Sequence, residues 1–247
     1  MKLYGWKYKG RIISNKLHEQ FLEIINYLDD PTFIANKDWP TVQKLIAKNL
    51  NIKPGQVRTI KRVLEEFCVL KEGSLNGNKI PDATIYTSEG YEFVKMLKLE
   101  ALINNSKTND TEMLNKINLF YQYYYLKVLS KPVDSGRGTT LRTLRATLKA
   151  IKKFDYLDYW EWYILNTIIT EDDNPTQERE LEETINKYRN KQLLFTDEDI
   201  VENKLSHSYL LGNFKWTGLI ETTGSKNNLR IRLNKLKEST INIVINE

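Results

Sequence analysis

The sequence predicts a mainly α-helical protein with short β-hairpin wings, in which a helical linker joins two winged-helix (helix-turn-helix) subdomains. Two observations predict this fold class. Apolar residues recur at helical spacing along most of the 247-residue chain. In each half, a periodic stretch leads into a Gly/Asn-rich segment of hairpin composition, 71–79 or 224–228, which a strand-like run follows. Two helices joined by a tight turn and followed by a hairpin are the skeleton of a winged helix.

The N-terminal half gives the order helix, turn, helix, hairpin, helix. The short turn 53–55 separates two amphipathic stretches, as a helix-turn-helix requires. The residues 83–87 are strand-like and are expected to be the return strand of the hairpin. Helices are expected at 17–28, 41–51, 56–70 and 91–102.

The polar segment 104–111 has no periodicity and predicts an exposed connection. We therefore expect an N-terminal winged-helix subdomain at 1–105, and a helical connector with a second winged-helix subdomain at 106–247. The strands of the second wing are expected at 219–222 and 229–233, and the closing run 241–246 is too short to classify. Helices in this part are expected at 112–129, 141–154, 156–170, 176–191 and 199–216.

The composition is that of a folded protein without a membrane anchor. It is 40% apolar and 11% aromatic, which is ample for ordinary cores. No run approaches the roughly 20 apolar residues that span a bilayer, and the N-terminus lacks the apolar core of a secretory signal, so a cytoplasmic location is expected. The one cysteine, Cys68, lies in an apolar run and is expected to be a small buried residue.

The charges are segregated along the chain, although the net charge is only +5. Residues 1–16 and 135–153 contain bases and no acid. Residues 171–202 contain eleven acids and four bases, and 203–237 contain seven bases and one acid. Such segregation predicts a basic face that binds a phosphate backbone, and ordinary solvated surface charge is the alternative.

The helix expected at 56–70 has the side chains of a DNA-reading helix near its N-terminal end. Arginine can contact guanine and glutamine adenine through paired hydrogen bonds in the major groove, while lysine and threonine can also meet phosphate. A helix that is merely polar on its solvent side is the alternative. The candidate residues here are Lys53, Gln56, Arg58, Thr59, Lys61 and Arg62.

Further candidates for DNA contact lie in the basic blocks and in the second winged helix. Arg142, Arg145 and Lys149 recur at spacings of three and four, which places them on one helix face as a phosphate-contacting ridge or a solvated face. The other candidates are Lys7, Lys9, Arg11, Arg137, Lys204, Ser206, His207, Ser208, Asn213, Lys215, Lys226, Asn227, Asn228 and Arg230.

No catalytic or metal site is expected in this chain. With His18 and His207 as the only histidines and with one cysteine, neither a zinc site nor a nucleophile–histidine pair can be built. The closest match to a metal-dependent nuclease is Glu202-Asn203-Lys204 with Asp197 and Asp199 upstream. These residues have the pattern of a helix start, and no strand is expected to carry them.

Several segments together resemble the DNA-recognition region of type IIS restriction endonucleases. The opening Tyr4-Gly-Trp-Lys-Tyr-Lys-Gly-Arg11 with helix 17–28 is similar to the start of these enzymes. The helix pair containing 157–169 and 181–189 is similar to the pair that these enzymes carry between their recognition units. The segment Tyr209-Leu-Leu-Gly-Asn-Phe-Lys-Trp-Thr-Gly-Leu-Ile220 with its Asn/Gly wing resembles the second winged helix of the family.

The resemblance implies that the chain reads a short asymmetric site on double-stranded DNA as a monomer. In FokI-like enzymes a separate C-terminal nuclease domain cuts with magnesium, and this sequence ends where that domain would begin. We therefore expect a recognition domain or subunit without a cofactor of its own, which works with a nuclease domain or subunit. The alternatives are a winged-helix regulator of transcription or plasmid replication, which would bind a palindrome as a dimer, and a winged-helix module that binds protein.

Overall fold

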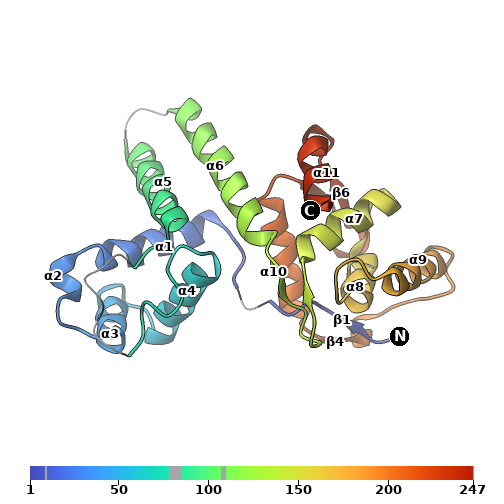
Figure 1. Ribbon diagram of the computed structural model, residues 1–247, viewed down its shortest axis with the longest axis horizontal. Helices are drawn as coiled ribbons and strands as arrows, with labels where there is room; N and C mark the ends of the chain where they lie inside the picture. Colours follow the sequence, from blue (N-terminus) through green and yellow to red (C-terminus); the bar gives the residue numbers. More distant parts are fainter. Residues whose placement is uncertain (9, 78–79, 81–84, 107–109, 247) are drawn as a thin grey trace. The chain divides into compact units, whose positions relative to one another are not determined.

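The computed structural model shows a mainly helical protein with small sheets of two strands each (Figure 1). The structure describes residues 1–8, 10–77, 80, 85–106 and 110–246, and it describes 205, 206 and 227 without their side chains. The chain divides into two compact units. The N-terminal unit comprises residues 10–124, and the C-terminal unit comprises residues 1–9 and 125–247.

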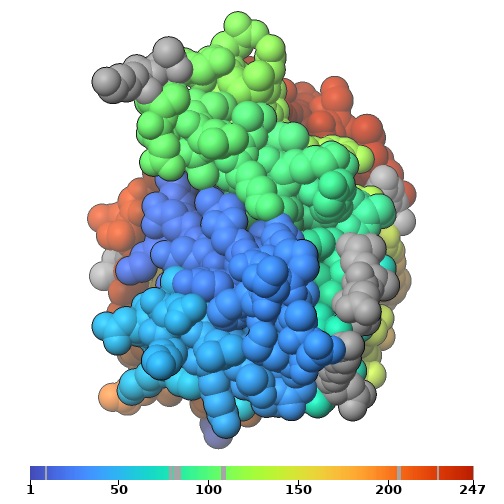
Figure 2. Space-filling model, turned by 90° about the vertical axis from the view of Figure 1, so that its left-hand side faces the viewer, coloured from blue at the N-terminus to red at the C-terminus, as the bar shows by residue number. Residues whose placement is uncertain are grey.

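The N-terminal unit is a group of helices around an aromatic and aliphatic core. Helix α1 begins after Ser14, whose hydroxyl accepts a hydrogen bond from the backbone N–H of Leu17, and it buries Phe21 and Ile24. In Figure 2 the blue surface of α1 and α2 lies beside the green surface of α5. The helices among the described residues of this unit are α1 (Asn15–Leu28), α2 (Pro31–Ile34), α3 (Trp39–Asn49), α4 (Pro54–Glu66), α5 (Ser88–Asn105) and the start of α6 (Thr111–Leu129).

Helix α4 is shifted toward the N-terminus from the predicted range 56–70. Pro54 occupies the first turn, where its missing N–H costs nothing, so the expected turn residues already belong to the helix. The Gln56 side chain accepts a hydrogen bond from the backbone N–H of Lys53. At the other end, Cys68 has a left-handed backbone with φ 57°, which stops the helix before Leu70.

The chain after α4 pairs with the segment before α5. Leu70 and Tyr86 form an antiparallel bridge, supported by hydrogen bonds from the Lys71 N–H to the Ile85 oxygen and from the Thr87 N–H to the Val69 oxygen. The base of the predicted hairpin is therefore present. Residues 78–79 and 81–84, which include the start of the strand expected at 83–87, lie outside the described residues. At residue 80, the backbone N–H donates to the Lys37 oxygen, 3.1 Å away.

Replacing Gly90 with alanine is expected to destabilise the N-terminal unit by about 1–3 kcal/mol. A Cβ atom at this position would lie 2.0 Å from the backbone oxygen of Val69, so the first turn of α5 would have to move away from the backbone at Val69. Urea unfolding followed by circular dichroism measures the loss. Gly55→Ala is the matched control. Gly55 lies in α4, and a Cβ atom added there would meet no neighbouring atom, so this variant should be neutral or slightly stabilising.

The first half of α6 belongs to the N-terminal unit. The Tyr121 ring packs against Phe93, and the Tyr124 hydroxyl donates to the backbone oxygen of Phe67 at 2.7 Å. The division between the units therefore falls between Tyr124 and Tyr125, whereas the sequence places it near residue 105. The polar segment 104–111 marks the break between α5 and α6, but the packing of the tyrosines continues across that break.

The C-terminal unit combines helices with three two-stranded sheets among its described residues. Strands β2 (Val133–Asp134) and β3 (Thr140–Leu141) form a small hairpin that the sequence did not predict. Helix α11 (Glu238–Asn246) covers the run that could not be classified. The other helices are α7 (Thr143–Phe154), α8 (Tyr159–Ile168), α9 (Pro175–Arg189) and α10 (Lys204–Lys215), with short 3-10 helices at Asp197–Asp199, Lys226–Asn228 and Lys235–Lys237.

The first residues of the chain pack in the C-terminal unit. Strand β1 (Leu3–Tyr4) pairs in parallel with β4 (Ile200–Glu202), and the Trp6 indole N–H donates to the backbone oxygen of Ile169. A helix predicted over 199–216 is therefore wrong at its start. The segment first forms β4, and Asn203 then adopts a left-handed backbone with φ 58°, so that α10 starts at residue 204.

The hairpin of strands β5 (Ile220–Thr223) and β6 (Arg230–Leu233) confirms the second predicted pair of strands. A positive φ of 71° at Gly218 turns the chain from α10 into β5. Leu157, in the connection between α7 and α8, pairs with Ile231 through two backbone hydrogen bonds of 3.0 and 2.8 Å. The connection thus lies along the free side of β6.

Candidate nucleic-acid interface

Helix α4 presents its predicted polar side chains to solvent and its apolar ones to the core. Val57, Ile60 and Val63 are buried, while Arg58 and Arg62 are exposed. Within the described part of the chain, the side chain of Arg58 makes no hydrogen bond or ion pair. A cation without a partner near the N-terminal end of an exposed helix face is free to meet an anionic or polar ligand.

The other candidates on α4 already interact with neighbouring groups of the same helix. The Thr59 hydroxyl donates to the Gly55 oxygen, and Lys61 forms a 2.6 Å ion pair with Glu65 in which both side chains are largely buried. Arg62 lies 3.6 Å from Glu66 in a more exposed pair. Arg58 is therefore the α4 cation with the greatest freedom to contact a ligand.

The basic block of the first residues is divided between the two units. Lys7 belongs to the C-terminal unit and pairs with Asp134 at 2.9 Å. Arg11 belongs to the N-terminal unit and donates to the Gln20 side chain. Lys9 lies outside the described residues.

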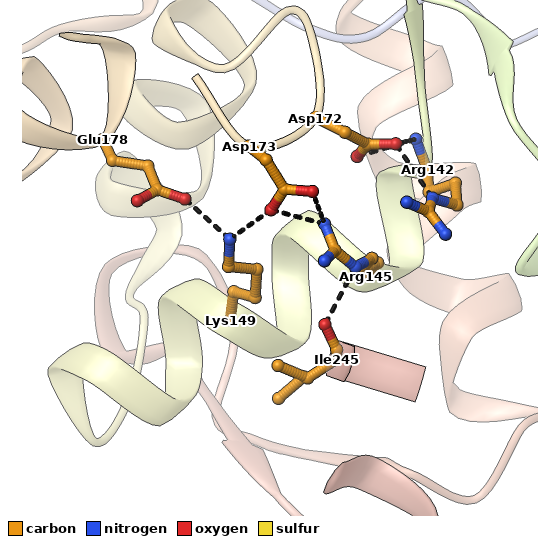
Figure 3. A network of polar contacts seen from close by, with 7 residues as sticks. All are labelled: Arg142, Arg145, Lys149, Asp172, Asp173, Glu178 and Ile245. Atoms are coloured by element: carbon orange, nitrogen blue, oxygen red, sulfur yellow. Dashed lines mark hydrogen bonds and ion pairs between the residues drawn. The ribbon is translucent and has the colours of Figure 1, made fainter. Parts of the chain in front are cut away.

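The three cations Arg142, Arg145 and Lys149 come together as their spacing predicts, but they face carboxylates. Arg142 pairs with Asp172 at 2.9 Å. Figure 3 shows the side chains of Arg145 and Lys149 pointing at the carboxylate of Asp173, each with a 2.8 Å contact. The acidic turn after α8 thus neutralises the expected phosphate-contacting ridge.

Two more contacts complete this ion-pair cluster. Lys149 also pairs with Glu178 at 2.6 Å, and the Arg145 Nε–H donates to the backbone oxygen of Ile245 (Figure 3). Arg145 is only 8% exposed. Hydrogen bonds from Arg145 and Lys149 lower the pKa of Asp173 to about 2. The cluster ties α7 to the segment before α9, to α9 itself and to α11, so its cations do not form an open surface.

Replacing Asp173 with asparagine is expected to lower the free energy of unfolding at pH 7 by up to about 1 kcal/mol. The loss is small because the carboxylate is about half exposed, so that solvent screens its ion pairs. Because the pKa of Asp173 is lowered on folding, its stabilisation is present above the unfolded value of 3.8 and is lost as the pH falls toward 2. The difference between wild type and variant should therefore shrink over this range. Urea titrations at a series of pH values test this, with the exposed Glu183→Gln as control.

Helix α10 directs two of its predicted DNA-contacting side chains inward. The His207 ring stacks on Tyr163 with 3.6 Å between ring centres, and its Nδ1 accepts a 2.9 Å hydrogen bond from the Asn166 amide. Burial holds the pKa of His207 well below its usual value, so the ring is neutral. Asn213 is buried and donates to the Tyr8 hydroxyl. Both residues are core residues, which corrects their assignment to the DNA-contacting surface.

Among the positions of α10 whose side chains are described, Lys204, Ser208 and Lys215 are exposed, and they follow one another at helical spacing. Lys204 lies 3.8 Å from Asp197, while Lys215 has no ion pair among the described residues. The side chain of Ser206 lies outside the description. In a helix the side chains that face the core recur every three to four residues. His207 and Asn213 occupy such core-facing positions, although both are polar.

The hairpin after α10 carries the remaining candidates. Lys226 pairs with Asp197 at 2.5 Å, and Asn228 is exposed. Arg230 donates to the Leu229 oxygen. The side chain of Asn227 is not among those described. Outside the hairpin, Arg137 donates to the Thr167 oxygen and lies 4.9 Å from the ring centre of Tyr4.

An aromatic and basic patch on β6 went unnoticed in the sequence. Arg230 and Arg232 lie 4.6 and 5.7 Å from the ring centre of Tyr156, and Arg189 lies 4.5 Å from it. The alternation Arg-Ile-Arg over 230–232 could have revealed that both arginines share a face of the strand. The contact with Tyr156 could not be foreseen, because it depends on the pairing of Leu157 with β6.

A cleft of about 350 Å³ lies between α10, the hairpin and the start of α8. Its wall is aromatic at Tyr159 and basic at Lys215 and Lys226, with Ser208 and Thr222 as hydroxyl groups. His207 lines it as well, and its Nε2 atom is buried without a hydrogen-bond partner among the described residues. The cleft thus offers donors and positive charge next to an apolar surface.

Neither a metal-binding group nor a membrane span is found in the described part of the chain. No set of three or more histidine, cysteine, aspartate or glutamate side chains there is placed to hold a metal ion. Glu202 does lie on a strand, β4, contrary to expectation. No helix among these residues is both long and apolar enough to cross a bilayer. Comparison with protein-family models, with curated proteins and with solved structures finds no match to this chain.

Proposed function

We propose that this protein binds double-stranded DNA in a sequence-dependent manner through two winged-helix subdomains, one in each compact unit. The observation that carries the proposal is a repeated order of elements with a repeated backbone pairing. In each unit a helix is followed by a short extended segment and then by further helices. After these comes the β5–β6 hairpin in the C-terminal unit, and in the N-terminal unit the segment whose ends pair at Leu70 and Tyr86. In each unit a residue of this last segment, Ile80 or Ile231, donates a backbone hydrogen bond to the extended segment.

In the N-terminal unit the extended segment is at Lys37, between α2 and α3, and Ile80, which lies between the bridged residues Leu70 and Tyr86, donates to it. In the C-terminal unit the extended segment is at Leu157, between α7 and α8, and Ile231 of β6 pairs with it. The helix directly before each hairpin, α4 or α10, is then the one that would enter the major groove. The C-terminal unit differs by the insertion of α9 and β4 before α10.

The chemistry of the two helices supports this assignment. Arg58 on α4 and Lys215 on α10 are exposed, and neither has an ionic partner in the described part of the chain. The N-terminal turn of α4 contains no acid, so it favours approach of the phosphate backbone. The arginines of β6, the half-buried Arg230 and the exposed Arg232, add positive charge to the hairpin. A protein-binding module would not need unpaired cations on both helices.

Within this function, we propose the role of recognition domain or subunit of a type IIS restriction endonuclease, for which a separate or additional nuclease domain would cut the DNA with magnesium. This part of the proposal is supported by the sequence resemblance alone. It predicts one protein per short asymmetric site. A regulator of transcription or plasmid replication would instead bind a palindrome as a dimer.

Selection of bound duplexes from a random-sequence pool, followed by sequencing, tests the proposal. A recurrent short motif is expected, and the logarithm of its affinity should fall with the logarithm of the salt concentration by about 0.9 per phosphate contact. The stoichiometry on the selected duplex separates a monomer on an asymmetric site from a dimer on a palindrome. Binding that is independent of both sequence and salt would contradict the proposed function.

A further inference from the structure

One carboxylate stands between two of the lysines that the sequence assigns to DNA contact. The Oδ2 atom of Asp197 lies 2.5 Å from the Nζ of Lys226 and 3.8 Å from the Nζ of Lys204. Lys204 is the first residue of α10, and Lys226 lies in the hairpin loop between β5 and β6. The two lysines therefore come from the helix and the hairpin that flank the cleft, and Asp197 bridges them.

This arrangement is open to exchange with another anion. The side chains of Asp197, Lys204 and Lys226 are 44%, 58% and 50% exposed. Ion pairs that are exposed to this degree stabilise a protein very little. At the start of the 3-10 helix Asp197–Asp199, the backbone N–H of Thr196 donates its hydrogen bond to the side chain of Asp199 and not to that of Asp197. Asp197 can therefore leave the two lysines without loss of local structure.

The cleft beside this cluster has features of a ligand site. Lys226 lines it, and its Nζ lies 5.9 Å from the ring centre of Tyr159. Because the Asn166 amide donates to Nδ1 of His207, the neutral imidazole carries its proton on Nε2. That buried N–H has no partner among the described residues, although the ring borders the cleft. The cleft thus combines a cation, an aromatic ring and a neighbouring buried polar atom whose hydrogen-bonding capacity is unused among the described residues.

We propose that Lys204 and Lys226 form a binding site for a backbone phosphate of DNA, and that Asp197 occupies this site in the free protein as a built-in competitor. A phosphodiester group is negatively charged like the carboxylate, and its oxygens likewise accept hydrogen bonds from ammonium groups. Binding of DNA would replace Asp197 at the lysines and place the adjoining strand along the cleft. The inference rests on the proposed function and names the groups through which the C-terminal unit holds the backbone.

The test compares Asp197→Asn with Glu182→Gln on a short mixed-sequence duplex, with salt varied from about 50 to 200 mM. Both variants remove one negative charge from an exposed carboxylate that pairs with a lysine at 2.5 Å. Asp197→Asn is expected to tighten binding about two- to fivefold, the value of an exposed ion pair. Glu182→Gln should bind as the wild type does.

A second pair of variants keeps the test independent of folding defects. Lys226→Ala should lower the salt slope by about 0.9, the value of one phosphate contact, and the double variant Asp197→Asn/Lys226→Ala should lose most of the gain. Equal tightening by Asp197→Asn and Glu182→Gln, or a gain that survives in the double variant, would overturn this inference while leaving DNA binding intact. A wild-type chain that binds no duplex at low salt would instead overturn the proposed function and this site with it.

Discussion

Replacing Arg189 with methionine is expected to destabilise the C-terminal unit by about 3 kcal/mol, the lower end of what breaking a buried ion pair costs. Arg189 lies 2.5 Å from Glu161, whose side chain is only 1% exposed. Without the guanidinium, this carboxylate would stay buried with the backbone N–H of Asp158 as its remaining hydrogen-bond donor. Arg189 also donates to the oxygens of Phe154 and Tyr156, so the connection before α8 would loosen as well.

Thermal and urea unfolding measure this loss, and a fall in Tm of about 10 °C is expected. Arg179→Met is the matched control, because it removes an exposed arginine from the same helix and should change stability little. The double variant Arg189→Met/Glu161→Gln should recover part of the loss, since it removes the unpaired buried charge. A double variant that is less stable than Arg189→Met would show that the penalty does not come from the carboxylate.

The helices of this protein could be predicted from the sequence because their apolar spacing reflects burial directly. The ranges expected at 17–28 and 112–129 match α1 and α6 closely. The strands that pair over long distances could not be predicted in the same way. Strands β1 and β4 contain two and three residues, too few to show an alternating pattern, and they come from opposite ends of the chain. Nothing local connects them.

The candidate interface was predicted in part. The exposed face of α4 follows from its spacing, because Val57, Ile60 and Val63 must all turn inward. The roles of His207 and Asn213 could not be predicted, because the identity of a polar residue does not show whether it lies in the core or on the surface. Their hydrogen-bond partners, the Asn166 amide for Nδ1 of His207 and the Tyr8 hydroxyl for Asn213, are distant in sequence.

The charge blocks show the same limit of sequence reasoning. The sequence suggested a basic face and an acidic back, but part of the basic block 135–153 pairs with part of the acidic block 171–202 inside one unit. Charge order along a chain does not say whether opposite blocks face each other. Among the described residues, cations such as Arg58 and Lys215 remain open, because no acid pairs with them.

Replacing Arg58 with alanine is expected to reduce affinity for a selected duplex about tenfold or more, the effect of losing one paired contact to a base. Arg58 is exposed on α4, near the end that enters the groove in helix-turn-helix proteins, and no acid of the described chain neutralises it. If it reads a base, the loss should be confined to one position of the site, so that the variant tolerates other bases there.

Selection on a random-sequence pool with the Arg58→Ala variant measures this relaxation directly, beside titrations on the wild-type site. Lys95→Ala is the control, because it removes the same charge from an exposed side chain of α5 that already pairs with Glu92. It should leave both the site and the affinity nearly unchanged. A uniform loss over all sequences for Arg58→Ala would mean that Arg58 contacts phosphate, and an equal loss for both variants would mean that only the net charge matters. Either result would place base reading elsewhere than at Arg58 on α4.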